Sequence, residues 1–248
     1  MLYALASVSL WAYWSRRAHG LALAARVLVW LGFLCNTLAI GLRVHLTQRA
    51  PFANQYEFAL VFGWGIVLVL MIVSGRLRRL ELAVFSMPPA ALVMLYAWML
   101  PADVRPLMPA LMSTWLVIHV GLAVVSYGSF AVAAGIGALV LVGGKRLNLA
   151  ALDQMKQRIV IVGFFGLTLV IITGAVWAHQ AWSRYWGWDP KETWSLITWI
   201  VYAVYLHMSL NRGWTGRRSA YLAIIGFALV LFTYAGVNLL MSGLHTYR

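Results

Sequence analysis

Long apolar segments recur along the whole chain and restrict its fold more than any other feature. About 20 apolar residues are enough for a helix to cross the hydrocarbon core of a bilayer. Lipid offers no hydrogen-bond partners, so the backbone inside it must form helices or a closed barrel. Eight segments of this kind are predicted, of which the first is short for a full crossing: residues 2–14, 21–42, 58–74, 82–100, 113–142, 159–178, 194–210 and 220–241.

The composition agrees with this interpretation. Hydrophobic residues make up 63% of the chain and charged residues 10%, whereas a soluble domain carries about a quarter charged residues. We therefore predict an all-α, polytopic integral membrane helix bundle of about eight transmembrane helices. The connecting loops are too short for a soluble domain, so residues 1–248 are treated as a single membrane domain.

The net charge of +13 is explained by membrane topology. When the loops are assigned alternately to two sides, twelve lysines and arginines fall on one side and six on the other. Cytoplasmic loops carry such an excess of basic residues, which places both termini on the outer face. The basic charge therefore predicts no nucleic-acid partner, and membrane lipid is the expected surrounding.

Cysteine usage excludes several kinds of chemistry. Cys35 is the only cysteine, so the chain has no intramolecular disulfide and no C-x-x-C thiol pair. Any thiol chemistry must use the thiols of a partner protein.

The richest local pattern is W-S-R-Y-W-G-W-D-P-K-E-T-W, which runs from Trp182 to Trp194. It belongs to an external loop predicted over residues 179–193, here called the tryptophan-rich loop. Asp189, Pro190 and Glu192 form a helix-start signal, with a capping Asp, a proline at the first position and a glutamate at the third. The seventh helix is therefore predicted to begin at Pro190.

The same loop has the inventory of a binding site for a flat, acidic ligand. Trp186, Trp188 and Trp194 could supply stacking faces, while Arg184 and Lys191 could pair with carboxylates. Tryptophans also collect at membrane interfaces without any further role. Six of the chain's 13 tryptophans lie between residues 177 and 199, which favours a ligand platform over an interfacial belt. Haem, with its planar ring and two propionates, fits this inventory.

Three of the six histidines stand at informative positions. His119 lies about two turns into the fifth segment from its outer end, and His245 lies just beyond the outer end of the eighth. Two neutral imidazoles on the side of the tryptophan-rich loop could provide both axial ligands of a haem iron. His207 lies roughly 20 Å along the seventh helix from the loop, so it cannot reach the same iron. Ionisable residues at such a depth are functional candidates, and the missing companion ligand predicts a second subunit.

The tryptophan-rich loop resembles the WWD domain of haem-handling cytochrome c assembly proteins. The similarity is greatest to the CcsA (ResC) family, the membrane subunits of the System II cytochrome c synthase. Three further segments are similar to that family: P-F-A-N-Q-Y-E-F from Pro51, T-W-L-V-I-H ending at His119, and G-L-H-T-Y around His245. The chain differs from the family at Arg49, where a histidine is expected, and at His179, where asparagine is frequent.

The resemblance implies a site for haem b, held as a bound substrate between the external loop and two histidines. His119 and His245 would ligate the iron on the outer side. His207 would hold haem within the membrane, with a companion histidine from a CcsB (ResB) subunit. Residues expected in contact with haem are Trp182, Arg184, Trp186, Trp188, Asp189, Lys191 and Trp194.

The resemblance also implies the reaction and its setting. The chain would be a component of a holocytochrome c synthase, or haem lyase, that is active only with its CcsB partner. It would present haem to the C-x-x-C-H motif of apocytochrome c, with thiol-reducing proteins as further partners. The expected location is the bacterial plasma (inner) membrane, with the loop facing the periplasm or cell exterior. No side chain is predicted to act as a catalytic acid or base.

Two alternatives remain at this point. A CcmC-type protein also carries a WWD loop but delivers haem to a chaperone and has fewer spans. A haem-containing electron-transfer subunit usually carries histidine pairs inside the bundle on both faces, whereas only His207 is predicted to lie deep here.

Overall fold

Every regular element that the structure describes is helical. The computed structural model describes residues 1–104, 106–143 and 147–244. Seven helices in these ranges are long and apolar enough to cross a membrane, which confirms the predicted polytopic helix bundle. They are α2 (His19–Thr47), α3 (Gln55–Val73), α4 (Leu80–Trp98), α5 (Thr114–Val142), α6 (Leu149–Trp182), α7 (Pro190–Asn211) and the span Gly216–Leu240.

The first predicted segment forms a shorter helix. Helix α1 (Leu2–Arg16) has 15 residues, so its axis is about 22 Å long, less than the roughly 30 Å of hydrocarbon in a bilayer. It ends at Arg17, whose backbone adopts the left-handed conformation and turns the chain directly into α2. The first of the eight predicted segments therefore does form a helix, but that helix is shorter than a full span.

The chain divides into two compact units. The first unit, Met1–Val104, contains α1 to α4. Within it α1 packs against α2 and α4, and α3 packs against α4. Asn54 caps the start of α3 by accepting a hydrogen bond from the Glu57 amide at 2.8 Å.

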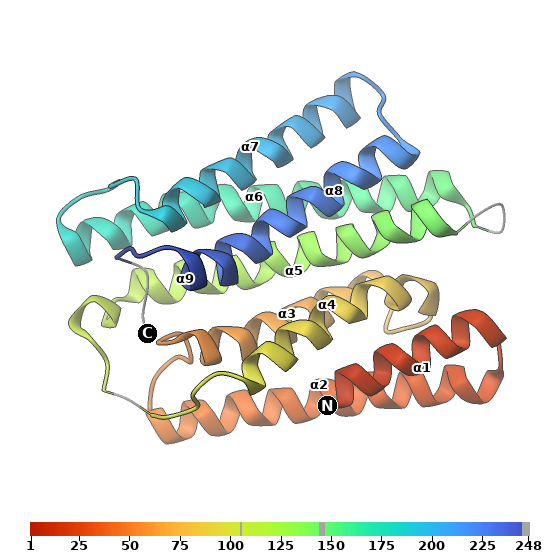
Figure 1. Cartoon of the computed structure of the whole chain (residues 1–248), viewed down its shortest axis with the longest axis horizontal. Helices are drawn as coiled ribbons and strands as arrows, with labels where there is room; N and C mark the ends of the chain where they lie inside the picture. Colours follow the sequence, from red (N-terminus) through yellow and green to blue (C-terminus); the bar gives the residue numbers. More distant parts are fainter. Residues whose placement is uncertain (105, 144–146, 245–248) are drawn as a thin grey trace. The chain divides into compact units, whose positions relative to one another are not determined.

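The second unit, Arg105–Arg248, is organised around α5. In α5, 83% of the most apolar stretch is buried, against 17% in α7, so α5 is the central helix of this unit. It packs along α6 and α8 (Gly216–Leu231), and α7 packs against α6 and α8 (Figure 1). The unit also contains a short 3-10 turn, η1 (Pro109–Leu111), ahead of α5.

The last span of this unit changes its helical geometry near its end. Helix α8 continues into a π-helical turn, η3 (Phe232–Gly236), and then into one α-helical turn, α9 (Val237–Leu240). A π-turn inserts an extra residue into the helix, and such insertions are frequent at functional sites. The chain leaves α9 at Met241, whose backbone is extended, and continues without regular structure to Gly243, with Leu244 in a turn.

Several helices extend beyond the predicted apolar segments. Helix α6 begins at Leu149 and ends at Trp182, whereas the apolar segment covers only residues 159–178. Helix α2 likewise continues to Thr47. As a result His45 and His179, which lie outside the predicted apolar segments, are helical and exposed.

Candidate functional site

Every residue that the sequence nominates for the site falls within the bounds of the second unit. The irregular part of the predicted loop 179–193 is limited to residues 183–189, because α6 continues to Trp182 and α7 begins at Pro190. The predicted start of the seventh helix at Pro190 is therefore confirmed. His245 lies outside the described residues, while its neighbour Leu244 is described.

A complete capping box fixes the junction between the loop and α7. One oxygen of Asp189 accepts a hydrogen bond from the Lys191 amide at 3.1 Å. In return, Oε2 of Glu192 accepts from the Asp189 amide at 3.1 Å and from the Gly187 amide at 2.8 Å. The box therefore satisfies amides both at the helix start and inside the loop, as the sequence pattern predicts.

Asp189 also contacts the C-terminal segment of the chain. Its Oδ2 accepts a hydrogen bond from the Leu244 amide at 2.7 Å, across 55 residues of sequence. Asp189 is buried, with 7% of its surface exposed. Two segments that the resemblance assigns to one site, the W-G-W-D motif and the G-L-H motif, thus meet at this carboxylate.

The backbone of the loop is strained at Trp188. This residue has a φ of 56°, and a bulky side chain in the left-handed region is a genuine outlier. Trp188 is 69% exposed, and its indole meets the indole of Trp186 edge to face, with ring centroids 5.7 Å apart. Strain of this kind persists where the surrounding structure holds it and clusters at functional sites.

The charged and aromatic residues around the loop differ in their surroundings. Arg184 is exposed, and its guanidinium packs over Gly187, where an added Cβ would come within 2.8 Å of it. Lys191 is half-buried in the first turn of α7. Trp194, one turn further, packs against Phe232 of the π-helical turn at 4.4 Å between ring centroids.

His119 is held by α6. Its Nδ1 lies 2.8 Å from the carbonyl oxygen of Val170. A carbonyl only accepts, so Nδ1 carries the proton, and a neutral imidazole in this tautomer has its lone pair on Nε2. Gly174 makes room for the ring, because a Cβ at that position would lie 2.8 Å from His119 Cε1.

A chain of aromatic contacts links His119 to the start of the loop. The imidazole stacks on Trp177 with 6.0 Å between ring centroids. Trp177 in turn meets Trp182 edge to face at 4.9 Å. Trp177 is almost fully buried, and its Nε1 donates to the Ala110 carbonyl at 2.8 Å. Although the sequence does not nominate Trp177, its place between His119 and Trp182 makes it part of the site.

His207 lies far from these residues. It is the eighteenth residue of α7, about 26 Å along the axis from Pro190 and near the end of the helix at Asn211. Its ring is exposed on the surface of the unit, and its Nδ1 lies 3.2 Å from Nδ2 of Asn211. The structure therefore separates it from the other predicted site residues, as the sequence analysis expects.

The arrangement around the loop offers the groups that the predicted haem site would use. The His119 imidazole has its lone pair on Nε2, the nitrogen that would ligate iron. The exposed face of Trp188 suits a flat ring. The side chains of Arg184 and Lys191 offer full positive charge for carboxylates, whereas the amides at the start of α7 are taken up by the capping box.

A buried charge cluster in the first unit was missed by the sequence analysis. Glu57 is fully buried and accepts from Arg43 Nε at 2.9 Å and from Arg49 at 2.8 Å. The Ala53 amide donates to the same carboxylate at 2.8 Å, and Arg43 also donates to the carbonyl oxygens of Ala102 and Asp103. The sequence signal was an acid at the very start of an apolar segment.

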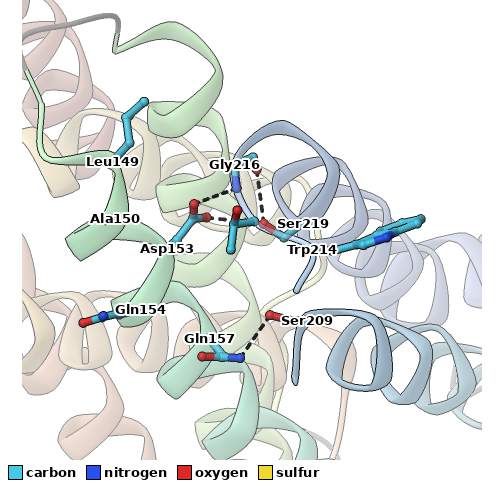
Figure 2. A pocket seen from close by; sticks show the side chains of 10 residues that line it. Leu149, Ala150, Asp153, Gln154, Gln157, Ser209, Trp214, Gly216 and Ser219 are labelled. Carbon is cyan, nitrogen blue, oxygen red and sulfur yellow. Dashed lines mark hydrogen bonds between the residues drawn. The ribbon is translucent and has the colours of Figure 1, made fainter. Parts of the chain in front are cut away.

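A cavity of about 430 Å³ lies at the other end of α6 from the tryptophan-rich loop (Figure 2). Asp153 accepts from the Gly216 amide at 2.6 Å and from the ammonium of the fully buried Lys156 at 2.6 Å. Lys156 also donates to Ser219 at 2.9 Å. These bonds fasten the start of α8 to α6, and no residue of this cavity was predicted to be functional.

Comparison with known proteins places these features in a family context. Residues 52–245 match the family described as "Cytochrome C assembly protein". The chain is 35% identical to the cytochrome c biogenesis protein CcsA of Prochlorococcus marinus (strain MIT 9301), over 90% of this chain and 84% of the relative. It is 36% identical to CcsA of Synechococcus sp. (strain CC9605), over 95% of this chain and 90% of the relative.

The fold itself is found in a solved structure. The cytochrome c haem lyase CcmF superposes with a TM-score of 0.74 at 15% sequence identity. The match covers 99% of this chain and 45% of that protein. At this level of identity the similarity concerns the fold.

Proposed function

Because this chain belongs to the cytochrome c assembly protein family, we propose that it binds haem at its external WWD loop and presents it for attachment to apocytochrome c. It would do so as the CcsA-type subunit of a membrane-bound holocytochrome c synthase. Family membership supports a role in cytochrome c biogenesis, in line with the names of the CcsA relatives.

The observation that carries the proposal is the meeting of two distant motifs at Asp189. The loop W-G-W-D ends at this residue, and the segment that leads into His245 is bonded to it through the Leu244 amide at 2.7 Å. A C-terminal histidine and a tryptophan face would serve a common ligand only if their segments lie together. The bond supports that requirement without involving the ligand.

The proposed iron ligands are His119 and His245. The hydrogen bond from His119 Nδ1 to Val170 fixes the ring and its tautomer, as carbonyl partners do for metal-ligating histidines. The stacked Trp177 and the small Gly174 limit rotation of the ring. Ligation by both imidazoles would keep oxygen from the iron. One ligand must later yield to the histidine of the cytochrome.

Attachment adds each cysteine S–H of the C-x-x-C-H motif across one vinyl C=C of haem, forming a C–S and a C–H bond. The residues of this chain contribute by binding and orientation. Tryptophan faces would stack on the ring, and the side chains of Arg184 and Lys191 would pair with its carboxylates. Asp189 and Glu192 are engaged in the capping box, so we assign neither a proton-transfer role.

We place a second contact with haem at His207, together with a histidine of a CcsB-type partner subunit. The exposure of His207 on α7, a helix that is buried over only 17% of its most apolar stretch, supports a partner on that face. The complex would reside in the bacterial plasma membrane with the tryptophan-rich loop on the outer side. Thiol-reducing proteins would keep the cysteines of the apocytochrome reduced.

Absorption spectroscopy tests the external ligands directly. The chain is purified with its co-expressed CcsB partner, and oxidised and reduced spectra are recorded for wild type, His119→Gly and His245→Gly. We expect a six-coordinate haem spectrum that weakens in both variants and recovers when imidazole is added. An unchanged spectrum in both variants would refute the ligand assignment. Haem-free protein throughout would refute haem binding at the loop.

A further inference from the structure

The carboxylate of Asp189 performs two tasks with its two oxygens. Capping of α7 uses Oδ1, which accepts from the Lys191 amide. A helix cap needs only one such oxygen, and asparagine or serine supplies it about as well as aspartate. The second oxygen accepts from the Leu244 amide. Aspartate at position 189 therefore supplies one acceptor oxygen more than capping alone requires.

The packing of the C-terminal segment on Asp189 is very close. A Cβ at Gly243 would lie 2.4 Å from Oδ2 of Asp189 and 3.0 Å from Cδ of Pro190. Both contacts belong to the rigid start of α7, so neither can yield easily. Only glycine lets the segment approach near enough for the Leu244 amide to reach the carboxylate.

We infer that Asp189 is a positioning residue for the C-terminal histidine, acting through the backbone of Leu244 and not through contact with haem. The inference rests on the proposed role of His245 as an iron ligand. His245 follows Leu244 directly, and consecutive Cα atoms are about 3.8 Å apart. A fixed Leu244 thus limits where an imidazole on the next residue can be.

The physical character of the bond suits an exchangeable ligand. A hydrogen bond from an amide to a buried carboxylate is stronger than one between neutral groups, and its charge comes from the protein. It orders the segment whether or not haem is present. We call this hydrogen bond between Asp189 and the Leu244 amide the anchor. Transfer of haem to the cytochrome requires release of His245 from iron. The anchor stays in place during that release and lets the histidine return.

The anchor is tested first without haem. Hydrogen–deuterium exchange with mass spectrometry follows the Leu244 amide in wild type, Asp189→Asn and Gly243→Ala. Asp189→Asn keeps one capping oxygen but can no longer accept at both positions. Gly243→Ala leaves Asp189 intact and forces the segment away. The control is Gly121→Ala, where an added Cβ meets nothing within 4 Å. We expect exchange at Leu244 to accelerate roughly tenfold in both test variants, as for loss of a charge-assisted bond.

The effect on ligation is measured with imidazole as the competing probe. The oxidised haem complex of each variant, copurified with the partner subunit, is titrated with imidazole, and His245→Gly serves as the reference for a missing ligand. If the anchor holds His245 near iron, Asp189→Asn and Gly243→Ala should each lower the half-saturating imidazole concentration about tenfold. The reason is that His245 would then be in position for less of the time and would compete less well with imidazole for the iron. Gly121→Ala should titrate like wild type.

The two measurements separate the failures. Unchanged exchange at Leu244 in both test variants would overturn the anchor. Faster exchange with an unchanged imidazole titration, while His245→Gly does respond, would overturn the positioning role. A titration that His245→Gly leaves unaltered would instead contradict the proposed function, while the exchange data would still decide whether the anchor exists.

Discussion

The Nδ1–H group of His119 donates a hydrogen bond to the carbonyl oxygen of Val170, 2.8 Å away on the neighbouring helix. This contact fixes which nitrogen of the ring carries the lone pair. It lies within the packed interface of α5 and α6, so the orientation of the ring depends on the packing of these two helices and not on the loop. Side chains of α6 should therefore control haem binding from positions that never touch haem.

Gly174→Ala should displace His119. The new Cβ would lie 2.8 Å from Nδ1 and Cε1 of the ring, so the ring must move and its bond to Val170 must lengthen. Losing such a partner typically costs a metal site about 10- to 100-fold in affinity. Haem retained per protein, measured by pyridine haemochrome assay after dilution, should fall accordingly. Gly121→Ala, on the same helix pair, is the control, and equal retention in both variants would contradict the prediction.

Trp188 should reveal separate roles for its backbone and its indole. Asparagine tolerates a positive φ, whereas valine does not. Both replacements remove the indole, so haem content should fall in both. Thermal unfolding of the haem-free protein should nevertheless show Trp188→Val less stable than Trp188→Asn by about 1–2 kcal/mol. Full haem retention in Trp188→Asn would exclude the indole as a stacking face.

Glu57 should be essential for the stability of the first unit. Glu57→Gln leaves Arg43 and Arg49 without their buried counter-charge, and breaking a buried pair in this way costs about 3–5 kcal/mol. Glu81→Gln is the matched control, because its pair with Arg17 is 30–40% exposed, and such pairs contribute about 1 kcal/mol or less. Unfolding of both variants in detergent gives their unfolding free energies relative to wild type. Equal losses of unfolding free energy in the two variants would contradict the stabilising role of the buried cluster.

Lys156 and Asp153 should behave as a coupled pair. Lys156→Met leaves the carboxylate of Asp153 without its cation and should lower stability by about 3 kcal/mol. The double variant Lys156→Met with Asp153→Asn should regain much of that loss, since asparagine can still accept from the Gly216 amide. A double-mutant cycle on unfolding free energies measures the coupling. Additive losses would show that the two residues act independently.

Local signals in the sequence were sufficient for some features. Asp189 and Glu192 are three residues apart, and the capping box they form depends only on that spacing, so the start of α7 at Pro190 could be predicted. The membrane class followed from hydropathy. Helix ends were harder: hydropathy measures the fit to lipid, whereas α6 continues as a helix past the apolar residues to Trp182.

Contacts between distant residues carried no local signal. Asp189 and Leu244 are 55 residues apart, and nothing in either segment alone predicts their bond. Arg43 and Arg49 follow the predicted apolar segment 21–42, and nothing in the residues around them indicates a partner for either. The structure instead places both on Glu57, because a buried acid requires compensation. The role of Trp177 behind His119 depends in the same way on how α5 and α6 pack.

The bond between Asp189 and Leu244 also has a consequence for how the protein is assembled in the membrane. Between these residues the chain passes through α7 and the span Gly216–Leu240. Two crossings bring it back to the side from which it left. If either span fails to insert, or stops halfway, the two residues are left on opposite faces, separated by roughly 30 Å of hydrocarbon. This hydrogen bond therefore requires that the last two spans end on the correct sides of the membrane. A chain in which only one of them inserts cannot bring Leu244 to Asp189.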